Sequence, residues 1–123
     1  MDIETYREYC LSKPFVSEDF PFDQETLVFK VKGKIFALGD ITHFKSVNLK
    51  CDPEKAIELR TEYPAVEPGY HMSKKHWNTV RFDGTIGWKL LQEWIDDSYY
   101  LVVDSLPKKD REELYKLYPK KEK

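Results

Sequence analysis

The stretch Leu27-Val28-Phe29-Lys30-Val31-Lys32-Gly33-Lys34-Ile35-Phe36-Ala37-Leu38 decides the fold predicted for this chain. Its two apolar runs are typical of β-strands. Lys32-Gly33 between them indicates a two-residue turn, because glycine readily takes the positive φ that tight hairpins need. We therefore predict a β-hairpin whose strands cover residues 27–31 and 34–39.

Further strands are predicted on the C-terminal side of this hairpin. Residues 46–50 alternate polar and apolar side chains, as a half-buried strand does. Residues 77–82 form another strand, which the turn signal Asp83-Gly84 closes. The predicted sheet thus contains 27–31, 34–39, 46–50 and 77–82. Residues 66–69 fit a loop or an edge strand, and residues 14–24, which hold two prolines, fit an ordered loop.

Apolar residues at helical spacing predict helices between and around these strands. Residues 2–12 form an amphipathic helix that Pro14 ends. Asp52-Pro53 is the clearest helix start, since aspartate caps the helix and proline suits its first position. That helix extends to about Tyr63. A long helix follows Gly87, and residues 107–123 are expected to form a short last helix over 110–118 and a frayed tail.

Strands and helices without strict alternation predict the α+β class. The chain has 123 residues, of which 41% are hydrophobic and 15% aromatic, enough for one domain, 1–123, with a real core. We expect an antiparallel sheet that helices cover on one face. The other face should be partly solvated.

Composition also bears on the compartment. No apolar run approaches the roughly 20 residues that a membrane helix needs, and residues 1–5 lack the basic and apolar regions of a signal peptide. Two cysteines, Cys10 and Cys51, are too few for a disulfide framework, so both are expected to be free. These features predict a cytoplasmic protein with no membrane partner.

Cations are unevenly distributed in a chain whose net charge is -2. Residues 27–50 hold five lysines and one acid, and residues 69–82 hold Lys74, Lys75 and Arg81 without an acid. This asymmetry predicts one basic face. Its field is smaller than that of a dedicated nucleic-acid-binding domain, so any anion should be held modestly and be displaced by salt.

The segment 70–80 combines cations with aromatic rings, which suits phosphates and stacked bases. An ordinary alternative is a loop entering a strand, with Trp77 in the core and the lysines solvated. Strand alternation with Val80 inward places Trp77 and Arg81 on the opposite face, where an exposed pair would form a stacking platform. A bend at Asn78 would instead turn Trp77 inward.

An ordered set of short motifs resembles the MmcQ/YjbR family of small bacterial proteins. The motifs are Lys13-Pro14, Phe20-Pro21-Phe22, residues 28–36, Asn48 to Pro53, Pro68 to Met72, Lys74 to Val80 and Ser98 to Val102. The resemblance spans Lys13 to about Leu106. It implies a CyaY-like α+β fold, described in that family as a double-wing arrangement and suggested to bind DNA.

Catalytic chemistry is not indicated by the residues. His71 and His76 lie five apart, which suits no helical zinc pair, and the cysteines form no CxxC motif. Cys51 precedes a helix start, where the dipole could lower its pKa, but a small cysteine buried at a strand end is the commoner case. We expect no catalytic residue, no metal and no cofactor.

Two functions remain open at this point. The first is weak, non-catalytic DNA binding with little sequence preference, in which the hairpin tip is a wing. The residues expected to contact nucleic acid are Lys30, Lys32, Lys34, His71, Lys74, Lys75, His76, Trp77 and Arg81. The second is a protein-interaction or small-ligand-binding module that uses the same face.

Overall fold

The central hairpin forms as predicted. In a computed structural model, which describes residues 2–69 and 72–120, β2 (Thr26–Val31) pairs antiparallel with β3 (Lys34–Asp40). The turn residues Lys32 and Gly33 have φ values of 49° and 84°. Two successive positive φ angles define the type I′ turn, whose twist matches that of the strands it joins.

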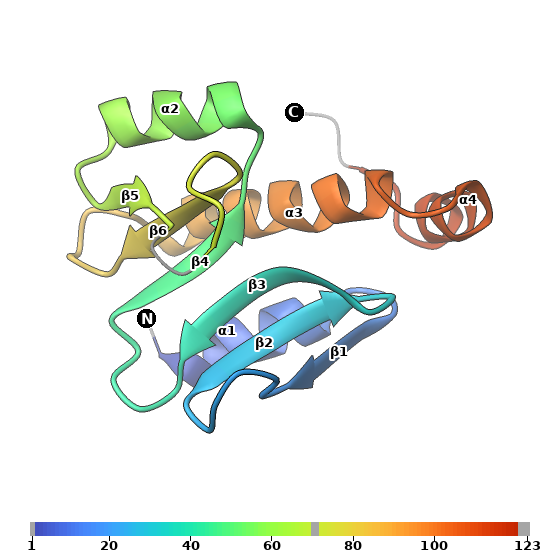
Figure 1. Cartoon of the computed structure of the whole chain (residues 1–123), viewed down its shortest axis with the longest axis horizontal. Coiled ribbons are helices and arrows are strands. Elements are labelled where there is room, and N and C mark those ends of the chain that lie inside the picture. Colours follow the sequence, from blue (N-terminus) through green and yellow to red (C-terminus); the bar gives the residue numbers. More distant parts are fainter. Residues whose placement is uncertain (1, 70–71, 121–123) are drawn as a thin grey trace.

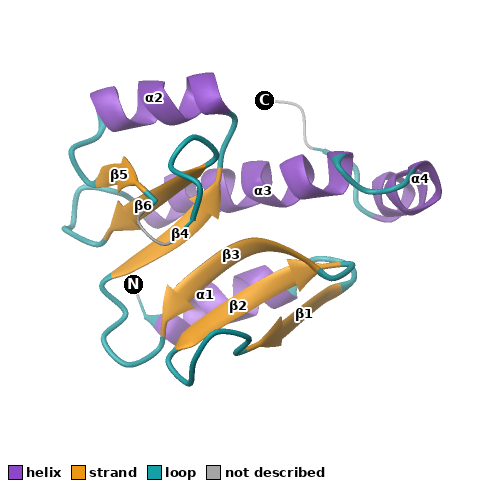
Figure 2. Ribbon diagram, viewed as in Figure 1, coloured by secondary structure: helices purple, strands orange, loops and turns teal. Residues whose placement is uncertain are grey.

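The hairpin lies within one antiparallel sheet of the order β1-β2-β3-β4-β6-β5 (Figure 2). The other strands are β1 (Val16–Asp19), β4 (Ser46–Lys50), β5 (Val66–Pro68) and β6 (Trp77–Arg81). All four predicted strands are confirmed, and the segment 66–69 contains an edge strand. The prediction that 14–24 is only a loop was wrong, because its two prolines flank β1 without interrupting it.

Four helices complete the α+β fold, as the sequence predicted: α1 (Ile3–Leu11), α2 (Pro53–Glu62), α3 (Trp88–Asp104) and α4 (Lys108–Leu117). The Asp52 side chain accepts hydrogen bonds from the backbone N–H groups of Glu54 and Lys55, at 3.2 and 3.3 Å, and so caps α2. Within the described ranges no helix is both long and apolar enough to cross a bilayer.

One face of the sheet carries the main core. In Figure 1, α1 and α3 lie behind the sheet and α2 lies beside β5. Side chains of these helices pack on inward-facing strand residues such as Phe29, Val47 and Val80. The fully buried Tyr6 donates a hydrogen bond to the backbone carbonyl of Leu38, at 3.2 Å, which joins α1 to β3.

The opposite face carries a second, smaller apolar cluster. Val28, Leu38 and Trp77 are buried there, with Ile35 and Met72 packed against them. Trp77 therefore points to the face that strand alternation predicted. It is only 6% exposed, however, so the predicted stacking platform on this face is wrong. Apolar neighbours from β2 and β3, together with Met72, fill the space that a base would need.

Gly69 provides a test of how closely two chain segments approach. A Cβ atom at Gly69 would lie 2.8 Å from the Trp77 Cβ atom and 3.1 Å from its carbonyl oxygen. Because both atoms belong to a paired strand, we expect Gly69→Ala to lower the free energy of unfolding by about 1–3 kcal/mol.

Urea denaturation measures this change. Gly87→Ala is the matched control, since a Cβ atom there meets nothing within 4 Å and should change stability by less than about 0.5 kcal/mol. Equal stabilities for the two variants would contradict the close approach.

Candidate ligand groove and the predicted basic surface

The hairpin lysines are engaged by their own chain. Lys30 Nζ lies 3.3 Å from an Asp19 carboxylate oxygen. Lys32 Nζ lies 3.7 Å from Asp110, 4.0 Å from Glu113 and 3.8 Å from the centre of the Phe15 ring. Lys34 donates a hydrogen bond to the Ser105 carbonyl at 3.3 Å. These contacts reduce the positive charge that the predicted wing presents to a phosphate.

Arg81 lies apart from the other predicted cations. The strand register pairs Arg81 with Ser46 and Trp77 with Lys50, so Arg81 sits at the opposite end of β6 from the segment 72–76. Its guanidinium contacts Glu67 at 2.7 Å and donates to the Pro64 carbonyl at 3.1 Å. The prediction of one continuous basic surface that includes Arg81 was therefore wrong.

The turn before β6 does present free cations. Lys74, Lys75 and His76 are exposed, and neither lysine forms an ion pair with another described residue. Arg60 holds this turn in place by donating to the Lys74 carbonyl and, at 2.7 Å, to the Asn78 side chain. His71, the remaining predicted contact, lies outside the described residues.

A groove of about 930 Å³ lies between α2 and α3, on the helix-covered side of the sheet. We call it the α2–α3 groove. Its apolar lining comes from Leu49, Leu59, Val80, Trp94, Tyr100 and Leu101. Charged side chains also line the groove, and so do Tyr118, Pro119 and Lys120 from the C-terminal segment. A concave apolar site with a few polar groups at its margin is the usual form of a small-ligand site.

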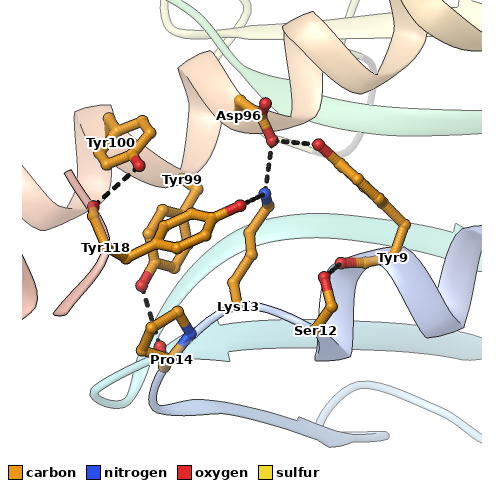
Figure 3. Close-up of polar contacts among 8 residues, drawn as sticks. All are labelled: Tyr9, Ser12, Lys13, Pro14, Asp96, Tyr99, Tyr100 and Tyr118. Atoms are coloured by element: carbon orange, nitrogen blue, oxygen red, sulfur yellow. Dashed lines mark hydrogen bonds and ion pairs between the residues drawn. The ribbon is translucent and has the colours of Figure 1, made fainter. Parts of the chain in front are cut away.

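A buried ion pair supports the α3 side of this groove (Figure 3). The Lys13 ammonium pairs with Asp96, which lines the groove, and donates to the Tyr118 hydroxyl at 3.3 Å. The Lys13 side chain has no exposed surface. The rings of Tyr9, Tyr99 and Tyr118 surround it, with centroids 4.4, 5.5 and 5.1 Å from Nζ, and we call them the tyrosine cage.

Hydrogen bonds fix the cage in turn. Tyr9 donates to Asp96 at 2.7 Å, and Tyr99 donates to the Pro14 carbonyl at 2.9 Å. Burial, followed by the Asp96 hydrogen bond, raises the pKa of Tyr9 well above its ordinary value. Burial also raises the pKa of Tyr100, to about 12. Tyr9 and Tyr100 are therefore neutral donors at physiological pH, to Asp96 and to the Tyr118 carbonyl.

The two thiols differ in access. Both cysteines are free, as predicted, but Cys10 is fully buried whereas Cys51 is half-buried and lines the α2–α3 groove. Burial, and then the charges of Asp97 and Asp52, raise the pKa of Cys51 to about 11. The suggestion that the α2 dipole lowers this pKa was therefore wrong, and Cys51 is a weak nucleophile at neutral pH.

Within the described ranges no group of three or more His, Cys, Asp or Glu side chains is placed to hold a metal ion. That the protein needs no metal or cofactor, and that it is not an enzyme, stay predictions. The groove was missed because its lining comes from residues far apart in sequence. The sequence did contain one signal for this site, Lys13-Pro14, in which a lysine follows an amphipathic helix. No spacing rule, however, identifies the partner of that lysine on α3.

This chain is similar to known proteins over most of their length and of its own. A family model described as YjbR matches residues 11–101. The protein YbdF of Escherichia coli O157:H7 is 44% identical over 109 residues, which cover 88% of this chain and 89% of YbdF. YjbR of Escherichia coli K12 is 32% identical over 118 residues, which cover 95% and 100% of the two chains. Both relatives are described as uncharacterised.

Solved structures share the fold. The crystal structure of Deinococcus radiodurans protein DR2400, described with a DUF419 domain, has a TM-score of 0.85 and 45% identity. The match covers 92% of this chain and 87% of the DR2400 chain. A Pseudomonas syringae crystal structure has a TM-score of 0.69 and 30% identity, covering 82% and 98% of the two chains.

We expect the two partners of the Lys13–Asp96 pair to differ in how much their substitution lowers stability. The Lys13 side chain is fully buried, whereas 31% of the Asp96 side chain is exposed. Asp96→Asn leaves an uncompensated buried ammonium, which we expect to cost about 3–5 kcal/mol. Lys13→Met leaves a carboxylate that still reaches water and still accepts from Tyr9, so we expect roughly half that loss.

Urea denaturation of both variants checks this order. Lys108→Met is the control, because it removes only an exposed pair with Glu112 on α4 and should cost less than about 0.5 kcal/mol. A loss in Lys13→Met that equals or exceeds the loss in Asp96→Asn would show that the buried ammonium does not govern this site.

Proposed function

The chain belongs to the YjbR family, and we propose that it is a binding module whose α2–α3 groove receives a small ligand. The observation that carries this proposal is the groove itself, about 930 Å³ in volume and lined by apolar and charged side chains. That volume falls within the range of about 300–1,000 Å³ common to small-ligand sites.

The surrounding contacts favour a preformed site. The buried Lys13–Asp96 pair and the tyrosine cage hold the α3 side, and the capped N-terminus of α2 holds the other side. Ser98 donates to the Phe36 carbonyl at 2.5 Å and accepts from the Lys50 N–H at 2.8 Å, which joins α3 to β3 and β4. A rigid groove binds a ligand without the entropic cost of ordering its walls.

Three tryptophans in separate surroundings allow a direct test. Trp94 lines the groove, Trp77 lies on the other face of the sheet, and Trp88 packs against Tyr9 at a ring distance of 5.4 Å. In ¹⁵N NMR titrations with a panel of small aromatic and aliphatic compounds, we expect binding compounds to shift the Trp94 indole resonance. The Trp77 resonance should stay unchanged.

Cys51 supplies the matched control. Because the thiol is a weak nucleophile, its N-ethylmaleimide adduct is formed with excess reagent and confirmed by mass spectrometry. The adduct would occupy the groove, so it should no longer show the Trp94 shifts. A Cys51→Ser variant treated with the same reagent should retain them, since Cys10 is fully buried. If no compound shifts Trp94, or if the adduct responds like the variant, the groove is not the binding site.

Weak nucleic-acid binding is a second candidate, and the exposed Lys74, Lys75 and His76 favour it. The strand register places their turn at the same end of the sheet as the hairpin tip, where Lys32 and Lys34 could add long-range attraction. The pairing of the hairpin lysines and the burial of Trp77 weaken this candidate relative to the form expected from sequence.

Fluorescence anisotropy with duplex DNA at several salt concentrations tests it. We expect dissociation constants of roughly 10⁻⁴ to 10⁻⁶ M at physiological salt, with little sequence preference. The double variant Lys74→Gln/Lys75→Gln should reduce the salt slope by about one for each lysine that contacts a phosphate.

A matched double variant on α4, Lys109→Gln/Lys116→Gln, changes the net charge equally and lies away from this turn. It should bind DNA like the unmodified protein. Equal losses in both double variants would indicate attraction by net charge alone, and no binding at low salt would remove this candidate.

A further inference from the structure

The charges around the α2–α3 groove differ in whether they already have partners. Asp96 pairs with Lys13, and Asp104 pairs with Lys120 at 3.6 Å. Asp52 caps α2, and Asp97 also has an interaction of its own. Four of the acids that line the groove are therefore engaged before any ligand arrives.

The lysines of the groove are not engaged in this way. Lys50 from β4, Lys55 from α2 and Lys89 from α3 all line the groove, and none forms an ion pair within residues 2–69 and 72–120. Glu93 is the remaining acid of the lining. It lies one helical turn from Lys89, close enough to offset part of that charge.

Lys50, Lys55 and Lys89 thus lack ion-pair partners among the described residues, whereas most acids of the lining already have partners. A ligand that fills the groove removes water from Lys50 and Lys55, and an anionic group on the ligand would compensate for that loss. A cationic group would meet carboxylates of which Asp96 and Asp104 already pair with lysines and Asp52 already accepts backbone hydrogen bonds. The apolar floor formed by Leu49, Val80 and Trp94 favours an apolar or aromatic body on the same ligand.

From this arrangement we propose that the α2–α3 groove binds small amphipathic anions, that is, molecules with an aromatic or apolar body and a carboxylate or comparable anionic group. The anionic group lies against Lys50 and Lys55, and the body lies on the apolar floor. This inference rests on the proposed ligand-binding function and adds the chemical class of the ligand to it.

Three naphthalene compounds separate charge from shape: naphthalene-2-carboxylate, naphthalene-2-carboxamide and naphthalen-2-ylmethylammonium. Each is titrated into the full chain while the Trp94 indole resonance is followed. We expect the carboxylate to bind about two- to fivefold more tightly than the amide for each lysine engaged, with the ammonium weakest. The preference for the carboxylate should shrink as salt is added.

Charge variants assign the contacts. Lys50→Gln and Lys55→Gln should each weaken the carboxylate about two- to fivefold and leave the amide unchanged. Lys89→Gln should have a smaller effect, because Glu93 already offsets that charge. Glu93→Gln should strengthen carboxylate binding. Lys109→Gln, an exposed lysine of α4 outside the groove lining, is the control and should change nothing.

The outcomes distinguish the two levels of the proposal. If all three compounds shift Trp94 with equal affinity, or if the ammonium binds best, the inference of an anionic ligand is overturned and the ligand-binding function stands. If none of them shifts Trp94 at millimolar concentration, both are overturned. A preference for the carboxylate that survives in Lys50→Gln and Lys55→Gln would also overturn the inference, because the anionic group of the ligand would then contact other residues.

Discussion

The buried Lys13 ammonium is the constraint on which the arrangement of helices depends. Removing a lysine from water is costly unless its charge and its hydrogen bonds are satisfied. Here a carboxylate from α3, a hydroxyl from the segment after α4 and three tyrosine rings meet around one nitrogen atom. Segments from both ends of the chain must therefore reach α3 together. The position of α3 fixes one side of the α2–α3 groove.

The same structure shows why the number of charged residues in a stretch of sequence is a poor guide to where an anion binds. Two of the three hairpin lysines, Lys30 and Lys32, face acids of β1 and α4, whereas Lys50 and Lys55 have no such partner among the described residues. A cation that is already paired contributes little further attraction to an incoming anion, and salt screens what remains. Lys30 and Lys32 are thus less available to an anion than Lys50 and Lys55 are.

Local signals in the sequence were sufficient for most of the fold. Lys32-Gly33 specified its turn through backbone geometry, and Asp52-Pro53 specified the start of α2 through capping, because both effects involve only neighbouring residues. Long-range packing was beyond such signals. The alternation of β6 gave the correct face for Trp77, but its burial depends on Val28, Leu38 and Met72 from other segments.

The candidate site was less predictable for the same reason. Its lysines lie on three different elements, and their importance depends on which acids are already occupied. Lys13-Pro14 was visible as part of the family resemblance, yet its role emerges only when Asp96, more than 80 residues away in the chain, is placed beside it. Tyr118 and Lys120 show the same limit. The expected frayed tail was wrong for Lys120, whose side chain pairs with Asp104, and no signal indicated that Tyr118, at the end of the predicted last helix, contacts Lys13.

The two edges of the sheet have a consequence for how copies of the protein behave at high concentration. An exposed strand edge offers unpaired backbone groups to another chain and so invites edge-to-edge aggregation. At one edge β1 has four residues, two of them acidic, and at the other β5 has three residues and ends in Pro68. Short, charged or proline-containing edges are poor templates for a further strand. The sheet can therefore remain open at both sides without recruiting its neighbours.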